Sequence, residues 1–199
     1  AAIKAAQATI TDAQRQAIDY WAGGGVLRWN QVMRELVARY NLPPAPRDNG
    51  SYPAPDANNP FADPQFPFAN PPYSVRAYSY VSVAQYEALK VAWHYKFLYN
   101  REAPSQVDGG VQALLPASGV PSYPSEDAVL SGVSTEMLRL LFPAAVEEIT
   151  RRAAEQREAA LLGGRASATD IAAGLALGRA VAAVLVARAA TDGMGAAAG

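Results

Sequence analysis

Proline is distributed unevenly along this chain of 199 residues, and its distribution limits where regular structure can form. Ten of the fifteen prolines fall between Pro43 and Pro72, and none precedes Pro43. An interior proline removes a hydrogen bond from a helix and clashes with the preceding turn, and central strands exclude it. Residues 43–72 are therefore predicted to be irregular, and long helices are confined to the sequence on either side.

The Pro-rich segment 43–72 also contains large aromatic side chains, which a simple solvated linker would not need. Two interpretations stay open: a long loop that packs its aromatic residues on the helices, or a strap that docks a protein partner. The Asp and Asn residues within 56–63 lack the spacing of a calcium-binding loop, so no metal or cofactor is predicted. The aromatic residues are Tyr52, Phe61, Phe66 and Phe68.

The flanking sequence shows helical periodicity and no alternating strand pattern, which predicts an all-α helical bundle with a long Pro-rich loop. Capping signals open helices at Thr11, Ser125 and Ser167. The helix over 73–100 has apolar residues on several faces and is predicted to be the central one. The other expected helices cover 11–21, 26–40, 125–142, 143–162 and 167–190. The predicted regions are 1–42 (N-terminal helices), 43–72 (the Pro-rich segment, packing on the bundle), 73–193 (the helical core) and 194–199 (a flexible tail).

Composition excludes several classes of function. The formal net charge of −1 gives no reason to expect a nucleic acid as partner. The absence of cysteine excludes disulfides, thiol nucleophiles and thiolate metal sites. Residues 1–10 show no signal-peptide pattern.

The stretch Ile171–Ala190 is long enough to span a membrane, but Arg179 near its middle and its many alanines favour a helix packed in a soluble bundle. Within this stretch, Gly174 and Gly178 are both poor helix formers, four residues apart. They are predicted to form a flat strip against which another helix packs closely.

The segment from Tyr123 to Asp127 reads Tyr-Pro-Ser-Glu-Asp. It resembles a catalytic element of the type-2 phosphatidic acid phosphatase and vanadium haloperoxidase superfamily, in which Pro-Ser-Gly-His opens a helix. Ser125 matches the serine, whereas Glu126 and Asp127 stand where glycine and histidine are expected.

Two further segments carry the resemblance, in the order the superfamily has them. Lys96 and Pro104 match a Lys-x6-Arg-Pro element, but Ala103 stands at the arginine. The last segment is similar to the end of a Ser-Arg-x5-His element, with Ala160 and Ala166 in place of the arginine and histidine. It keeps a glycine pair and a spaced run, namely Gly163, Gly164, Asp170, Gly174 and Gly178.

The resemblance implies a chemistry that this chain cannot perform. Phosphatases of the superfamily use one histidine as nucleophile and a second as acid, with arginines and a lysine around the phosphoryl oxygens. The chain has a single histidine, His94, two residues before Lys96, and a packed or hydrogen-bonded role is predicted for it. No catalytic residue is therefore assigned.

What remains is a vestigial pocket of Lys96, Ser125, Glu126 and Asp127. Negative charge at a helix start satisfies the positive end of the helix dipole, so the carboxylates take the place of a bound oxyanion. Lys96 is predicted to form a salt bridge with Asp127 or Glu126.

Two functions follow from the resemblance. The first is a non-catalytic scaffold or subunit of a larger assembly, with a protein partner and an exported, periplasmic or cell-surface location. The alternative is an enzyme of the same superfamily, a phosphoric monoester hydrolase or a related enzyme, with an altered site that uses Ser125, Asp127 or Lys96.

Overall fold

The computed structural model describes residues 2–40, 47–51, 71–115 and 119–194. These residues form helices and no strand, so the all-α prediction is confirmed. In chain order the elements are α1 (Ala2–Ala8), α2 (Asp12–Ala22), α3 (Gly25–Tyr40), α4 (Pro71–Tyr99), α5 (Pro104–Val107), α6 (Glu126–Leu141), the 3-10 turn η1 (Pro143–Ala145), α7 (Val146–Leu162) and α8 (Ala168–Ala189).

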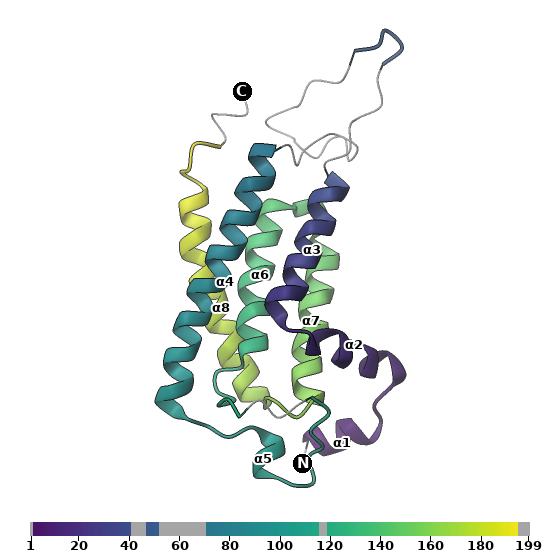
Figure 1. The fold of residues 1–199 in the computed structure, drawn as a ribbon, viewed down its shortest axis with the longest axis vertical. Coiled ribbons are helices and arrows are strands. Elements are labelled where there is room, and N and C mark those ends of the chain that lie inside the picture. Colours follow the sequence, from purple (N-terminus) through teal and green to yellow (C-terminus); the bar gives the residue numbers. More distant parts are fainter. Residues whose placement is uncertain (1, 41–46, 52–70, 116–118, 195–199) are drawn as a thin grey trace.

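Helix α6 lies at the centre of the bundle, with α4, α8, α7 and α3 around it (Figure 1). The prediction that the helix over 73–100 is the central one is wrong. Helix α4 leaves Val75, Val83 and Tyr86 exposed and buries seven of its 29 residues, whereas α6 buries eleven of its sixteen. Small side chains such as Ser131 and Gly132 in α6 let neighbouring helices approach it from several sides.

The close packing of α6 on α8 depends on two glycines, as predicted. A Cβ atom on Gly174 would collide with the carbonyl oxygen of Ser125, and one on Gly178 would collide with that of Val129. Both glycines are buried. Because the obstructing atoms belong to the backbone, no side-chain rotation could make room.

Most of the Pro-rich segment, with all its aromatic residues, lies outside the described residues, as do residues 195–199 of the predicted tail. The described part shows one correction: Pro71 and Pro72 belong to the first turn of α4 rather than to an irregular segment. The first turn of a helix tolerates proline, because the N–H groups there have no intrahelical acceptor.

Helix α8 is long and apolar enough, by length and composition, to cross a membrane, and it alone among the described helices passes that test. It has 22 residues, and its most apolar 18-residue stretch has a mean hydropathy of 1.8 and is 22% buried. One face packs on α6 through the two glycines. The prediction of a packed helix in a soluble bundle stays a prediction.

Candidate functional site

The four residues of the predicted vestigial pocket do lie together. Lys96 at the end of α4 and Ser125, Glu126 and Asp127 at the start of α6 line one pocket of about 150 Å³. The rest of its wall comes from Trp93, Val120, Pro121, Ser122, Arg165 and Ala166. Three separate parts of the chain therefore meet there: the end of α4, the start of α6 with the preceding loop, and the turn before α8.

Ser125 acts as the N-cap of α6. Its hydroxyl oxygen accepts a hydrogen bond from the backbone N–H of Ala128 at 3.3 Å, which satisfies one of the free donors of the first turn. Its own backbone N–H donates to the carbonyl of Asp170 at 3.0 Å, which joins this helix start to α8. The Ser125 side chain is thus engaged in helix capping and is buried.

Lys96 is buried, but its partner differs from the predicted one. Its ammonium donates to the carbonyl oxygen of Pro121 at 2.5 Å, and among the described residues it forms no ion pair. The predicted salt bridge to Asp127 or Glu126 is therefore wrong, because the loop carbonyl lies closer to the ammonium than either carboxylate does. Burial lowers the pKa of Lys96, and attraction from Glu126 and Asp127 opposes this lowering.

Asp127 has partners that the sequence analysis missed. One carboxylate oxygen accepts from the amide of Gln156 in α7 at 3.3 Å, and the other lies 3.9 Å from the guanidinium of Arg165. Gln156 in turn accepts from the indole N–H of Trp29 in α3 at 2.7 Å. This relay of buried or half-buried groups links α3, α7, α6 and the turn before α8.

A sequence signal for Gln156 did exist. It follows Ile149 and Ala153 at helical spacing and precedes Ala160, so it lies on the buried stripe of α7 rather than on the charged face. A polar residue on such a stripe indicates a buried hydrogen-bond partner. No comparable signal pointed to Arg165, because its role depends on where the turn lies.

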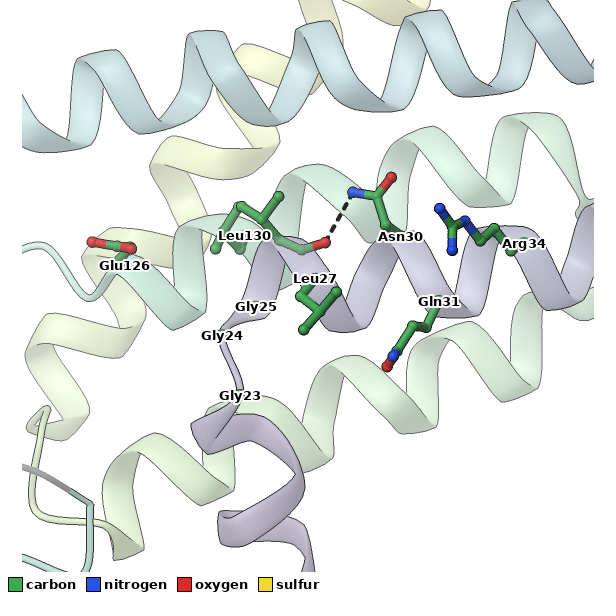
Figure 2. A pocket seen from close by; sticks show the side chains of 10 residues that line it. Gly23, Gly24, Gly25, Leu27, Asn30, Gln31, Arg34, Glu126 and Leu130 are labelled. Atoms are coloured by element: carbon green, nitrogen blue, oxygen red, sulfur yellow. Dashed lines mark hydrogen bonds between the residues drawn. The ribbon is translucent and has the colours of Figure 1, made fainter.

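Glu126 also borders a second, larger pocket of about 580 Å³ (Figure 2). Figure 2 shows Glu126 and Leu130 of α6 beside the Gly23–Gly25 turn, with polar side chains along α3. One of these, Asn30, donates to the carbonyl of Val26 at 2.9 Å. Glu126 is thus the ionisable residue that the two pockets have in common.

Burial raises the pKa of Glu126 above its ordinary value of 4.5, with repulsion from Asp127 adding to the rise and Lys96 opposing it. Between pH 4.5 and this raised pKa, the folded state therefore binds more protons than the unfolded state. The contribution of Glu126 to the free energy of unfolding falls over this range and stays lower at higher pH, where the group is ionised. Glu126→Gln is expected to raise the free energy of unfolding at pH 7.5 and to lose that advantage below about pH 4.5, as chemical denaturation at both pH values would measure. A variant less stable than wild type at pH 7.5 would contradict this assignment.

The other positions singled out in the sequence contribute no chemistry to the pocket. His94 is exposed on α4, with its ring 5.3 Å from that of Tyr95, and is not a packed residue as predicted. Its position on the helix turns it away from the face that carries Lys96. Ala166 lines the pocket, Ala160 is buried, and Ala103 is half-buried before α5.

No group of three or more His, Asp or Glu side chains suited to a metal ion occurs within the described ranges. No protein-family model matches the chain, and no curated protein matches it. The geometry of the pocket and the surface of the bundle therefore carry the functional argument.

Proposed function

We propose that this protein is a non-catalytic scaffold or subunit, in which the former catalytic pocket of a phosphatase-like or haloperoxidase-like bundle serves as a charged structural joint. The observation that carries the proposal is the state of Asp127. Both of its carboxylate oxygens are engaged by the protein itself, one by Gln156 and the other by Arg165. These two contacts tie the start of α6 to α7 and to the turn before α8, which suits a structural role for the Asp127 side chain.

The positions of three residues in the fold support the proposed kinship with the phosphatase and haloperoxidase superfamily. Lys96, Ser125 and Ala166, which lie far apart in the sequence, line the same pocket. The resemblance assigns the corresponding positions in the superfamily to one site. If the resemblance were accidental, there would be no reason for these three segments to meet in one pocket.

Electrostatics favour a joint over an oxyanion site. An empty helix start attracts an anion through its free N–H groups and its dipole. Here Glu126 and Asp127 place two carboxylates in the first turn of α6, and they act on Lys96 in place of an external anion. A phosphate entering the pocket would meet both negative charges at close range.

The surface near the end of α4 supports a protein partner. Phe97, Leu98 and Tyr99 are each more than half exposed, and Tyr99 lies with its ring centre 5.2 Å from that of Tyr123. Clustered exposed apolar side chains of this kind mark interaction surfaces, in which aromatic residues are enriched. The scaffold proposal assigns a partner contact to this end of the bundle, with the Pro-rich segment 43–72 as a further candidate.

One observation favours the alternative of an enzyme with an altered site. Burial lowers the pKa of Lys96 and raises that of Glu126. Burial thus favours the uncharged form of both groups, which line the same pocket. Shifts of this direction occur in acid–base pairs of active sites. The alternative would use Glu126 as acid and Lys96 as base on a small substrate.

The purified protein is expected to show no hydrolysis of an aryl phosphate and no vanadate-dependent halide oxidation above background. The groups that would act as nucleophile, acid and guanidinium clamp are replaced together, and loss of one such group commonly costs about 3–4 kcal/mol of transition-state stabilisation. Phosphate and vanadate are likewise expected to leave the melting temperature unchanged.

The controls for this assay are Lys96→Ala and Asp127→Asn, each compared with wild type for turnover and for stability. The structural joint predicts that both variants lower stability while turnover stays at background. Turnover by wild type that Lys96→Ala abolishes while the variant still folds would replace the scaffold proposal with the enzyme alternative.

A further inference from the structure

Lys96 differs from the other two lysines of the chain, because it is buried without an ion pair. Lys4 and Lys90 are exposed, and each is paired with a carboxylate, at 2.7 and 3.0 Å. Lys96 is only 3% exposed, and within the described ranges its one hydrogen-bond acceptor is the carbonyl oxygen of Pro121. An ammonium group has three donors, so a single acceptor compensates its charge poorly.

The surroundings of Lys96 therefore favour its neutral amine. Burial lowers the pKa of Lys96, and repulsion from Arg165 adds to the lowering. The carboxylates of Glu126, Asp127 and Asp170 oppose it, but burial has the larger effect. At a given pH, more of Lys96 is uncharged in the folded protein than in the unfolded chain. Only the uncharged amine is a nucleophile, and desolvated lysines are the ones that form imines with carbonyl compounds.

The amine borders a space of the size of a small molecule. The vestigial pocket has a volume of about 150 Å³, which is room for about five water-sized groups. Besides its charged groups, its walls include the apolar side chains of Trp93, Val120 and Ala166. Trp93 and Val120 are partly exposed, which leaves the pocket accessible from solvent. A short aliphatic compound with about five non-hydrogen atoms fits this space.

The charges of the pocket favour a neutral compound. Its lining has two cationic side chains, Lys96 and Arg165, and two carboxylates, Glu126 and Asp127. Arg165 already lies 3.9 Å from Asp127, whereas Glu126 forms no ion pair in the part of the chain that the structure describes. A carboxylate on the incoming compound would be repelled by Glu126. An uncharged aldehyde therefore suits the pocket better than a keto acid.

We propose that Lys96 is a covalent attachment site for a small neutral aldehyde, with Glu126 as the proton donor. The amine nitrogen attacks the carbonyl carbon, and a proton moves from nitrogen to the carbonyl oxygen to give a carbinolamine. Glu126 then protonates the hydroxyl group, which leaves as water, and a protonated C=N bond remains. The positive charge of this iminium balances the carboxylate that Glu126 has become. Burial raises the pKa of Glu126, which keeps more of it in the acid form that this step needs.

The product is compatible with the contacts of the folded protein. The iminium keeps one N–H, which can still donate to the carbonyl of Pro121. The inference goes beyond the scaffold proposal and does not rest on it, because the aldehyde is held and not turned over. The two also fail separately: a phosphatase assay does not report on imines, and imine trapping does not report on phosphate turnover.

The test is timed imine trapping with butanal, which has five non-hydrogen atoms. Folded protein and butanal are mixed at pH 7.5 and quenched with borohydride after set times, and mass spectrometry of the digested chain reads the butyl label at each lysine and at the α-amino group separately. Lys96 is expected to be labelled at least about fivefold faster than Lys4 or Lys90, because more of it is neutral. In urea that unfolds the chain, the three lysines should react within about twofold of each other.

Glyoxylate tests the role of charge. It has as many non-hydrogen atoms as butanal but carries a carboxylate. The ratio of labelling at Lys96 to labelling at the two exposed lysines cancels the different reactivities of the two aldehydes. This ratio should be at least about threefold smaller for glyoxylate, because Glu126 repels it. An equal or larger ratio would overturn the choice of a neutral aldehyde and assign the pocket to an anionic carbonyl compound held by Arg165.

Glu126→Gln and Asp127→Asn form a matched pair for the proton donor. Each removes one carboxylate that raises the pKa of Lys96, so neither reduces the fraction of neutral amine. Glu126→Gln should nevertheless slow the labelling of Lys96 by butanal at least about tenfold, because the acid is lost. Asp127→Asn should leave the rate equal or faster, since Gln156 and Arg165 engage that carboxylate in wild type.

Circular dichroism establishes that both variants are folded, and the comparison of folded with unfolded wild type needs no variant. The attachment site is overturned if folded wild type labels Lys96 no faster than Lys4 and Lys90. The role of Glu126 is overturned if folded Glu126→Gln is labelled as fast as wild type.

Discussion

Gly178→Ala is expected to lower the free energy of unfolding by about 2 kcal/mol or more, even though alanine is the better helix former by about 1 kcal/mol. The new Cβ would collide with the carbonyl oxygen of Val129 and lie 2.9 Å from the backbone nitrogen of Val133. Both atoms belong to α6, so α6 and α8 would have to move apart along their contact. Urea denaturation of the variant and wild type, followed by circular dichroism, measures the difference.

Two controls separate packing from helix propensity. Gly132→Ala in α6 should cost less, because its Cβ would lie 3.0 Å from the nearest backbone atom, the carbonyl oxygen of Leu175. Ala176→Val, at an exposed position of α8, should change stability by only about 0.5 kcal/mol. If Gly178→Ala matched wild type in stability, the two helices could not be packed as closely as the structure has them.

Trp29→Phe and Gln156→Met are each expected to cost about 2–4 kcal/mol of the free energy of unfolding. Each change removes one partner of the buried hydrogen bond between Trp29 and Gln156 and leaves the other without a partner. Gln156→Met also removes the donor to Asp127, so the joint at the start of α6 loses one of its two contacts. Chemical denaturation of both variants at pH 7 measures the cost.

The double variant Trp29→Phe/Gln156→Met distinguishes a hydrogen bond from simple loss of volume. Removing both polar partners avoids an unsatisfied buried group, so the double variant should be more stable than the sum of the single costs predicts, by about 1–2 kcal/mol. Strict additivity of the two costs would mean that the hydrogen bond contributes nothing. Trp21→Phe is a suitable control, because its indole N–H bonds the half-buried Glu155 and not Gln156.

Much of the helical architecture follows from local signals. The capping boxes at Thr11 and Ser167 and the hydroxyl cap at Ser125 correctly marked where helices begin. These signals are reliable because a cap and its acceptors lie within one turn of each other. The glycine strip of α8 was also predictable. Gly174 and Gly178 are poor helix formers that lie four residues apart on one face of the helix, and close packing by a neighbouring helix explains why neither position carries a side chain.

The partners within the pocket could not be predicted in the same way. The sequence placed Lys96 near the start of α6 through resemblance, yet its ammonium bonds the Pro121 carbonyl rather than a carboxylate. Which group lies closest depends on the course of the loop before α6, and differences of about 1 Å decide between a hydrogen bond and no contact. The pattern of charged residues along the sequence cannot predict distances between atoms to within about 1 Å.

The sequence by itself determined the helical class, most helix starts and the presence of a single histidine, because these depend on neighbouring residues or on composition. The tertiary structure alone decided that α6 is central and that Gln156 and Arg165 are the groups beside Asp127. Contacts between residues distant in sequence depend on how whole helices pack, and packing is settled by the volumes of all side chains together.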